Sequence, residues 1–279
     1  MPELPEVESI VRGIKNKIEG RSIVSAEMIK GRDDVIKYPS PLEYAGSIKG
    51  RTIEKVRRRG KYILLELSGG ILSVIHLRMT GRLIFVPDGR AADKYACVVY
   101  RLDDGSCLMY ADVRRLGTLH LLPAEDISTL KGLSSLGPEP LSEEFSADYL
   151  AQIAKGSRSR IKSFLLDQKH IAGLGNIYVD EALAISRIHP LRLAGSLSEG
   201  EIQALREAVN KVIAAGIKDG GTTFRDYRNG TGGKGAHQEH LYVYSRKGKA
   251  CRFCGAAIEK ITVGGRGTYF CPKCQVMKE

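Results

Sequence analysis

Four cysteines near the end of the chain constrain its fold more strongly than any other feature of the sequence. Cys251 and Cys254 are separated by two residues, and after a further sixteen residues Cys271 and Cys274 repeat that spacing. Two such pairs match the four-thiolate ligand set of a zinc ribbon. We therefore predict one structural Zn²⁺ ion, bound by these four side chains.

Charge and composition narrow the class of protein. The 279 residues carry a formal net charge of +11. Such an excess favours a polyanionic partner, nucleic acid before an acidic membrane, although a generally basic surface is the alternative. No apolar run approaches the ~20 residues of a transmembrane helix, and the acidic, proline-rich start is unlike a signal peptide. We expect a cytoplasmic protein of two or three domains with no membrane partner.

The first residues carry a possible nucleophile. The small side chain of Pro2 normally allows removal of Met1, which leaves a secondary amine that can condense with an aldehyde. Glu3 stands beside it as a proton carrier. Apolar residues at helical spacing follow as far as Ile18, and the positive end of that helix would keep the amine neutral and reactive. An ordinary helix start is the alternative.

Short apolar segments separated by turn signals dominate the first half of the chain, with no helical pattern between them. This pattern indicates an antiparallel sandwich or barrel. Cys97 and Cys107 fall in two of the segments and are expected to be small core residues. The segments span residues 61–67, 71–77, 82–86, 95–102, 107–112 and 118–122.

Helical patterns replace strands after the Gly-Pro-rich stretch 132–140. The last begins with a capping box at Ser198 and is predicted to end at Gly216. Before it, the stretch 171–178 holds two glycines and Asn176 ahead of a helix start. Free backbone N–H groups at such a start suit a phosphate, with the Asn176 amide as a further donor, although taken alone this stretch favours a plain helix–helix turn.

Glycine recurs in the next segment, 216–235, which is predicted to be either a linker or a lid over a site. Arg266 then stands among glycines between the two cysteine pairs. We expect it at the tip of a hairpin held by the metal.

In this order the pieces resemble the formamidopyrimidine-DNA glycosylase family, the bacterial 8-oxoguanine DNA glycosylases. The resemblance runs from Pro2 to the last cysteine pair. Its most specific marks are MPELPEVE at 1–8, RRGKYILLEL at 58–67, HLRMTG at 76–81, LGPEPL at 136–141, GLGNIY at 173–178 and GGRGTYFCPKC at 264–274.

The resemblance implies roles for individual residues. Pro2 matches the nucleophile that attacks C1′ of the damaged nucleoside, and Glu3 matches its acid/base partner. Lys61 matches a lysine of the strand-cleaving eliminations and of phosphate binding. Asn176 matches a phosphate ligand, and Arg266 matches the finger arginine that grips the phosphate near the lesion.

Other positions match the family less closely. Met79 and Arg114 match two residues that fill the void left by a flipped base, but Leu116 stands where the family usually has Phe. Tyr95 replaces a histidine as a possible phosphate contact, and His237 lies where the lesion loop usually has an aromatic residue. Arg158 and Lys162 are further candidate phosphate contacts.

The implied fold is α+β and multidomain. An N-terminal antiparallel β-sandwich with an N-terminal helix spans 1–131, and a helical helix-two-turns-helix domain spans 132–222. A lesion-recognition loop spans 223–240, and the four-cysteine zinc ribbon spans 241–279. The implied partner of a monomeric enzyme is damaged double-stranded DNA, which would place it at the bacterial nucleoid.

The implied activity is base excision of oxidised purines through a Pro2 Schiff base, followed by β,δ-elimination. An endonuclease VIII-like enzyme for oxidised pyrimidines is one alternative, although Leu4 favours the purine branch. A non-catalytic zinc-ribbon DNA-binding protein is another, which Pro2, Glu3 and Lys61 together argue against.

Overall fold

The computed structural model describes residues 1–224 and 227–278, and these form two compact units. Unit 1 comprises Met1–Ser134 and the returning segment Asp219–Gln238. Unit 2 comprises Ser135–Lys218 and the C-terminal part from Glu239. Of the predicted lesion-recognition loop, residues 225 and 226 lie outside the described residues.

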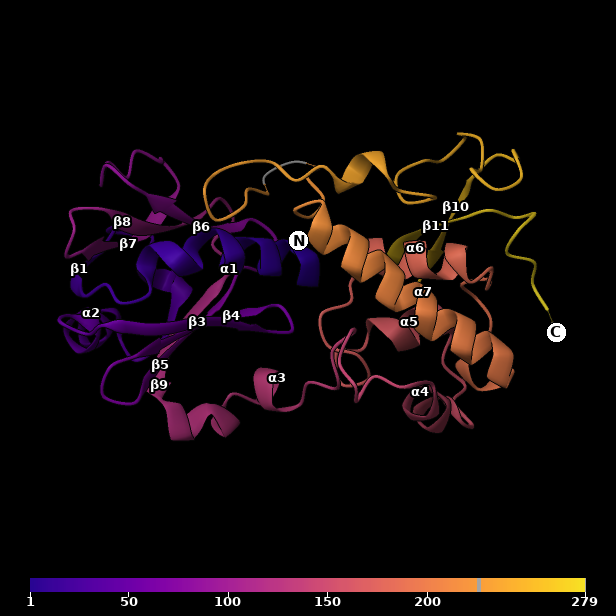
Figure 1. Ribbon diagram of the computed structural model, residues 1–279, viewed down its shortest axis with the longest axis horizontal. Coiled ribbons are helices and arrows are strands. Elements are labelled where there is room, and N and C mark those ends of the chain that lie inside the picture. The colour runs from indigo at the N-terminus through magenta and orange to yellow at the C-terminus, as the bar shows by residue number, and fades with distance from the viewer. Residues whose placement is uncertain (225–226, 279) are drawn as a thin grey trace. The chain divides into compact units, whose positions relative to one another are not determined.

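Two sheets build unit 1, as the alternating sequence pattern predicts (Figure 1). One has the strand order β1-β7-β8-β6 and is antiparallel, and the other has the order β2-β9-β5-β4-β3. Only the short β2 pairs in parallel among the described strands of the second sheet. The strands are β1 (Ile23–Met28), β2 (Ile36–Tyr38), β3 (Ile53–Arg59), β4 (Tyr62–Leu67), β5 (Ile71–His76), β6 (Gly81–Val86), β7 (Ala96–Leu102), β8 (Cys107–Asp112) and β9 (Thr118–Pro123).

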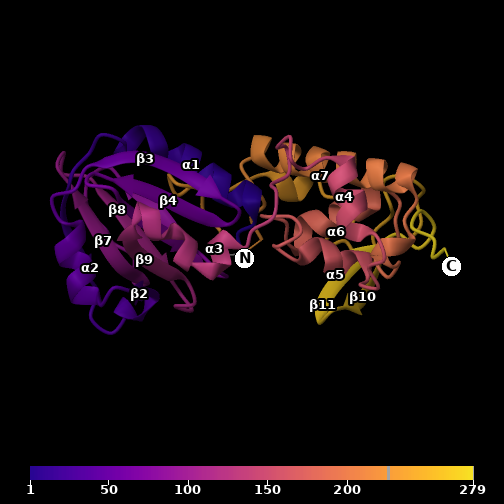
Figure 2. The same cartoon turned by 90° about the horizontal axis from the view of Figure 1, so that it is seen from below.

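Helix α1 (Leu4–Ile18) lies against the edge strands β6 and β3, one from each sheet (Figures 1 and 2). Its apolar stripe is buried in the same core as the inner faces of both sheets, because Val7, Ile10 and Ile14 recur at helical spacing. Cys97 and Cys107 are also buried, as expected. The other helical segments of unit 1 are α2 (Pro41–Ile48), α3 (Lys131–Ser134) and the 3₁₀ turns η1 (Asp33–Val35) and η2 (Ala124–Thr129).

The glycine-rich segment after α7 returns to unit 1. The carbonyl of Gly230 accepts a hydrogen bond from the Phe85 N–H at 2.9 Å. A Cβ on Gly13 of α1 would lie only 3.2 Å from the Gly230 Cα, so the two backbones approach closely. Part of this segment is therefore packed against α1, which a plain linker would not be.

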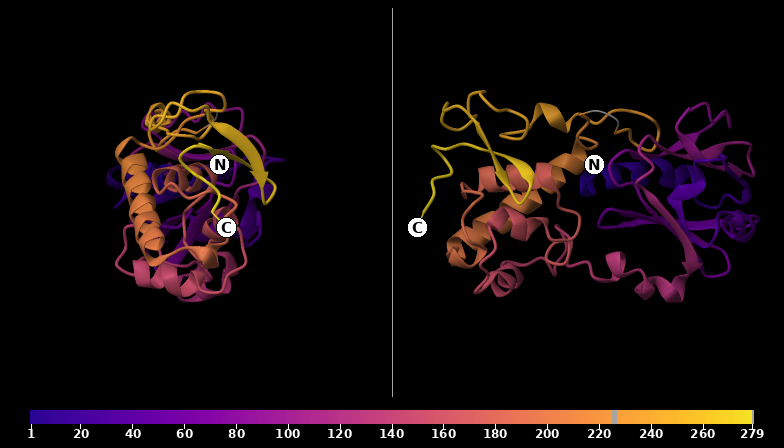
Figure 3. Two further views of the ribbon diagram at one scale, coloured as in Figure 1. Left: turned by 90° about the vertical axis from the view of Figure 1, so that its right-hand side faces the viewer. Right: turned by 180° about the vertical axis from the view of Figure 1, so that it is seen from behind.

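Unit 2 combines helices with the hairpin β10–β11 (Figure 3). The helix α6 packs against both α7 and β11. The capping box predicted at Ser198 is present, since the Glu201 N–H donates to Ser198 Oγ and the Ser198 N–H to Glu201 Oε2. The elements are α4 (Ala147–Ala154), α5 (Ile161–Leu166), α6 (Asn176–Ile185), η3 (Ala194–Ser196), α7 (Glu199–Lys218), β10 (Glu259–Val263) and β11 (Arg266–Phe270), with η4 (His237–Glu239) at the junction of the units.

The predicted end of α7 at Gly216 is wrong, because the helix continues to Lys218. Gly216 is buried on the face that meets α6. A Cβ there would lie 2.6 Å from Cε1 of Tyr178, a ring that is itself fully buried. The glycine therefore allows two helices to pack closely rather than ending one of them.

We expect Gly216→Ala to destabilise unit 2 even though alanine favours helix by about 1 kcal/mol. Overpacking against the fixed Tyr178 ring costs roughly 1–3 kcal/mol. Gly200→Ala in the same helix is the matched control, because a Cβ at Gly200 meets no atom within 4 Å. Thermal melting should show a lower Tm for the first variant and an equal or higher Tm for the second. Equal melting of both variants would contradict this packing account.

Candidate functional site

The start of the chain is anchored rather than frayed. Pro2 and Glu3 are buried, and Glu3 is the N-cap residue of α1. One carboxylate oxygen of Glu6 accepts the Glu3 N–H at 2.8 Å, and the other accepts the Thr222 N–H at 2.7 Å. The Tyr227 hydroxyl donates to the Glu6 carbonyl at 3.2 Å. Pro2 is therefore held at the N-terminus of α1, whose dipole disfavours a protonated amine.

Lys61 follows a tight turn between β3 and β4. Gly60 in that turn has φ of +56°, which favours glycine, and the Lys61 side chain is buried. Glu8 of α1 joins the turn to the helix through an ion pair of 3.0 Å with Arg58. Burial acts to raise the pKa of Glu8, but bonds to the Arg12 and Arg58 guanidinium groups outweigh it and the pKa is lowered.

His76, which opens the HLRMTG stretch, is a candidate site residue that the sequence pattern did not single out. It pairs in register with Tyr62, the residue after Lys61, and the two rings meet edge to face with centroids 4.6 Å apart. Its Nδ1 accepts the Arg78 N–H at 3.0 Å. Burial, then the positive charges of Arg78 and Lys61, lower the pKa of His76 to about 3. A neutral imidazole therefore stands next to the turn that carries Lys61.

The residues predicted to fill a void in stacked bases lie on two neighbouring stretches of unit 1. Met79 and Leu116 are exposed by 47% and 44%, so neither is a core residue. Arg114 Nη1 lies 3.1 Å from Met79 Sδ. The structure thus brings Met79 and Arg114 together, with Leu116 in the loop that carries Arg114.

Tyr95 and His237 occupy contrasting surroundings in unit 1. Tyr95 is half-buried, and its ring faces Lys94 Nζ at 5.0 Å and Arg32 at 5.6 Å. His237 is buried, and its Nδ1 lies 2.8 Å from a carboxylate oxygen of Asp219. His237 therefore ties the two ends of the returning segment together. A ring that contacts a lesion would have to be exposed, whereas the His237 ring is buried.

In unit 2, Asn176 and the finger hairpin are directly connected. Asn176 is the first residue of α6, after the N-cap Gly175, as the Gly-x-Gly-Asn pattern predicts. Its Nδ2 donates to the Gly267 carbonyl at 2.9 Å. Arg266, exposed at the start of β11, immediately precedes Gly267 and follows two glycines with positive φ. The structure therefore brings Asn176 to the base of the turn that presents Arg266.

The expectation that Lys162 contacts phosphate is wrong. Its side chain is fully buried, and Nζ lies 2.6 Å from Asp180 Oδ1 and 3.2 Å from the Gly267 carbonyl. A buried, paired ammonium group is not available to a solvent-side phosphate. Burial raises the pKa of Asp180 to about 7, whereas Lys162 and the Tyr269 N–H oppose that shift. Arg158, the neighbouring candidate, is exposed.

Adjacent carboxylates on α6 hold the C-terminal module. Asp180 Oδ2 accepts the Tyr269 N–H of β11 at 2.9 Å. Glu181 is buried and accepts the backbone N–H groups of Tyr242, Val243 and Tyr244 at 2.6, 2.9 and 2.8 Å. Buried N–H groups outside a sheet or helix need such acceptors. The position of Arg266 therefore depends on α6 as well as on the metal site.

The four predicted zinc ligands converge. The Sγ atoms of Cys251, Cys254, Cys271 and Cys274 all lie within 4.8 Å of one another. Two of the separations are 3.5 and 3.9 Å. A tetrahedral Zn²⁺ with bonds of about 2.3 Å requires about 3.8 Å between sulfurs. The donor set and its spacing therefore fit one Zn²⁺ ion.

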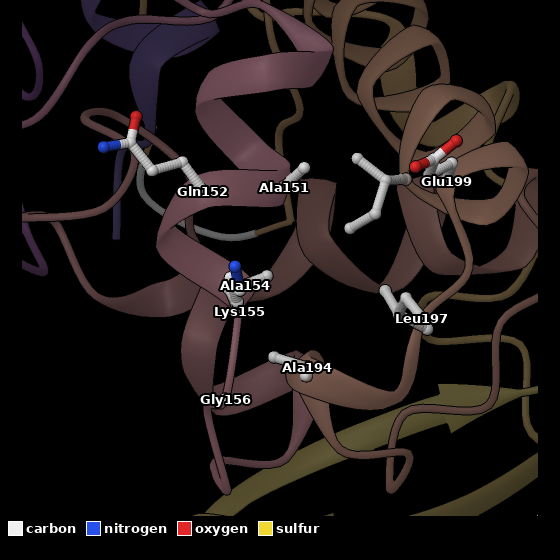
Figure 4. Close-up of a pocket in the computed structure, with 10 residues that line it drawn as sticks. Ala151, Gln152, Ala154, Lys155, Gly156, Ala194, Leu197 and Glu199 are labelled. Carbon is white, nitrogen blue, oxygen red and sulfur yellow. The ribbon is translucent and has the colours of Figure 1, made fainter.

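A pocket elsewhere in unit 2 lies between α4, η3 and the start of α7 (Figure 4). Its lining is mostly small and apolar, with Lys155 and Glu199 as the charged members. None of the predicted site residues lines it, so we assign it no part in the site.

Among the described residues, every helix is too short or too polar to span a bilayer.

An anchored N-terminal helix, a two-sheet β domain and a helical domain with a four-cysteine zinc module define a multidomain α+β protein. Family models match three parts of the chain. The formamidopyrimidine-DNA glycosylase N-terminal domain matches residues 1–119 and its H2TH domain matches residues 136–228. The zinc finger found in FPG and IleRS matches residues 248–276. The chain belongs to the formamidopyrimidine-DNA glycosylase family.

Similar proteins cover the whole chain. The formamidopyrimidine-DNA glycosylase of Desulforamulus reducens is 47% identical over 279 residues, which is 100% of both chains. A Lactococcus lactis FPG variant, solved in complex with a Fapy-dG containing DNA, has a TM-score of 0.91 and 36% identity, covering 99% of this chain and 100% of that one. MutM in complex with carbocyclic 8-oxo-G containing DNA has the same TM-score and coverage at 35% identity.

The His76 imidazole should stay neutral throughout the physiological range. Its pKa lies at about 3 in the folded chain against 6.5 in the unfolded chain. Only the unfolded chain binds the proton between those values, so the free energy of unfolding falls as pH drops from 6.5 towards 3. NMR of the ring protons, assigned with His76→Gln, should show no titration between pH 8 and 5. A midpoint near 6.5 would contradict the burial assigned to this group.

Loss of one zinc thiolate should release the arginine hairpin. Cys271→Ser is expected to lose Zn²⁺ and to weaken DNA binding by roughly tenfold or more, because the small apolar cluster of this module is built partly from the zinc cysteines themselves. Unit 1 has a separate core and should keep its circular dichroism. Cys271→His, which keeps a metal ligand, is the matched control and should retain zinc. Loss of zinc with unchanged DNA affinity would contradict the proposal that Arg266 contacts DNA.

Proposed function

We propose that this protein is a DNA glycosylase of base-excision repair that removes oxidised purines from duplex DNA and then cleaves the abasic site. The observation that carries the proposal is the buried Pro2–Glu3 start of α1 in a chain that belongs to this family over its full length. A DNA-binding protein without catalysis has no need of an anchored N-terminal secondary amine.

Removal of Met1 gives Pro2 a nucleophilic nitrogen. Its lone pair attacks C1′ of the damaged nucleoside, the glycosidic bond breaks, and its electron pair leaves with the base, which takes up a proton. Glu3 serves as the nearby proton carrier. Opening of the sugar ring leaves an iminium ion between Pro2 and C1′, and this cation acidifies the C2′ proton. Loss of that proton expels the 3′ phosphate, and a second elimination expels the 5′ phosphate.

The remaining groups position the phosphates. Lys61 supplies a positive charge close to the reacting sugar, and His76 supplies a neutral imidazole beside it. Asn176 Nδ2 donates one hydrogen to the Gly267 carbonyl, and its second hydrogen can be donated to a phosphate. Arg266 and Arg158 are exposed cations of unit 2 and contact the backbone of the duplex.

Base flipping requires a filler for the vacated stack. Met79, Arg114 and Leu116 are exposed on neighbouring stretches and supply it. Zinc is structural: the four thiolates leave no open coordination position for substrate. The enzyme acts as a monomer on damaged duplex DNA, and it is cytoplasmic in a bacterium, at the nucleoid.

The iminium intermediate provides the test. Borohydride should reduce it to a stable protein–DNA adduct on a duplex containing 8-oxoguanine, and Pro2→Gly should trap poorly because a primary glycine amine lacks the ring that orients the lone pair. A parallel duplex with an oxidised pyrimidine measures lesion preference on the same denaturing gel. Excision of the purine without any trappable adduct would overturn the mechanism. Stronger trapping on the pyrimidine duplex would overturn the assigned substrate class.

A further inference from the structure

Asp112 occupies a junction between the two stretches that carry the exposed residues Met79, Arg114 and Leu116. It is the last residue of β8, and its side chain is completely buried. The loop that follows it holds Arg114 and Leu116 and leads to β9. Thr80, next to Met79, lies in the turn before β6, the strand that pairs with β8.

The carboxylate of Asp112 receives four hydrogen bonds. On Oδ1 they come from Thr80 Oγ1 at 2.5 Å and the Arg114 N–H at 3.1 Å. On Oδ2 they come from the Gly117 N–H at 2.8 Å and the Tyr110 hydroxyl at 3.3 Å. One side chain therefore joins the turn of Met79 to both ends of the loop that carries Leu116.

A carboxylate accepts all four of these bonds, whereas an amide can accept only on its oxygen side. A backbone N–H can donate but cannot accept, and one such donor faces each oxygen of Asp112, from Arg114 and from Gly117. An asparagine amide in either orientation would set its NH₂ group against one of them. With the NH₂ group towards Gly117, a buried N–H loses its acceptor, which is costly. With the NH₂ group towards Arg114, that N–H keeps Thr80 Oγ1 at 3.1 Å, but the Thr80 hydroxyl loses the oxygen to which it donates. Either orientation therefore removes a bond that holds the loop.

The surrounding packing leaves the loop little alternative. A Cβ on Gly117 would lie 1.7 Å from the Tyr110 hydroxyl oxygen, so only glycine fits there. Arg115 has φ of +53°, an uncommon conformation for a residue with a side chain. Its guanidinium donates to the Gly31 carbonyl at 2.5 Å, which fixes the far side of the loop. The exposed tip thus rests on a rigid base centred on the carboxylate.

We infer that Asp112 is a positioning residue for base extrusion: it holds Met79, Arg114 and Leu116 in one rigid group that enters the base stack. The inference rests on the proposed function, because it gives those three side chains their task. Asp112 touches neither the sugar nor the reacting base, and it acts through the loop alone.

Asp112→Asn separates this role from general stability. Two duplexes of one sequence are compared, one with 8-oxoguanine and one with a preformed abasic site, where no base has to leave the stack. Excision of 8-oxoguanine should fall by roughly tenfold or more, as small displacements of positioning groups do. Cleavage of the abasic duplex should stay within about threefold of wild type, because the reacting groups are untouched.

Matched variants guard against a simple folding defect. Asp104→Asn makes the same change of charge in the β7–β8 turn, where the carboxylate serves only Ser106 and Arg21, and should leave both rates unchanged. Thr80→Val removes one donor from Asp112 and one acceptor from the Arg114 N–H, and Thr80→Ser keeps both. If Asp112→Asn does not fold, Thr80→Val should show the same selective loss in weaker form and Thr80→Ser should restore the wild-type rates.

Amide hydrogen exchange of the free protein gives a readout that needs no activity. In Asp112→Asn, or in Thr80→Val if that variant replaces it, exchange should accelerate at Arg114 or Gly117. Equal losses on the two duplexes, or unchanged excision, would overturn the inference, as would unchanged exchange. If the wild-type enzyme processes neither duplex, the proposed function fails by itself, and the exchange result still decides whether the side chain of residue 112 holds the loop.

Discussion

The carboxylate of Glu6 is the contact on which the catalytic half of the molecule depends. Chain termini usually fray, and a nucleophile at a frayed terminus would have no fixed position. Here one carboxylate accepts the Glu3 N–H within α1 and the Thr222 N–H of the returning segment. Two stretches more than 200 residues apart in sequence are thereby joined in unit 1. The apolar face of α1 then fixes the helix in the core.

Buried carboxylates hold two further loops of this protein. Asp112 accepts backbone N–H groups of the loop after β8. Glu181 accepts those of residues 242–244, an irregular segment that leads into the zinc module. Backbone N–H groups in such loops lack a ladder partner, and an anionic acceptor makes stronger hydrogen bonds to them than a neutral one. Each carboxylate thus sets the position of exposed residues that have few packing contacts of their own.

Much of the architecture could be predicted from local pattern. The six strands expected between residues 61 and 122 occur as β4 to β9 within about one residue at each end, because alternation and turn residues agree there. The sequences of strands β1 to β3 do not combine apolar alternation with flanking turn residues in this way. β3, for example, lies at a sheet edge and is rich in arginine and lysine. The cysteine spacing predicted the ligand cluster correctly, since two close pairs need only one hairpin each to converge.

Several properties depend on tertiary contacts, which the sequence pattern does not reveal. Gly216 resembled a helix end but is a packing glycine, because Tyr178 approaches it from another helix. Lys162 resembles a phosphate ligand in the sequence, but its ammonium group is paired with the buried Asp180, eighteen residues further along the chain. His76 carries no distinguishing local signal, because its neutral state arises from burial and from neighbouring cations. Such properties depend on which residues meet, and spacing along the chain does not record that.

We propose that the nitrogen of Pro2 performs the chemistry. This proposal is tested most directly by locating the covalent bond: the borohydride-reduced complex with 8-oxoguanine duplex is digested with protease and nuclease and read by tandem mass spectrometry. We expect a sugar remnant on the N-terminal peptide, at Pro2, with Met1 absent. A remnant on Lys61 or on any other lysine, or full activity with Met1 retained, would contradict it.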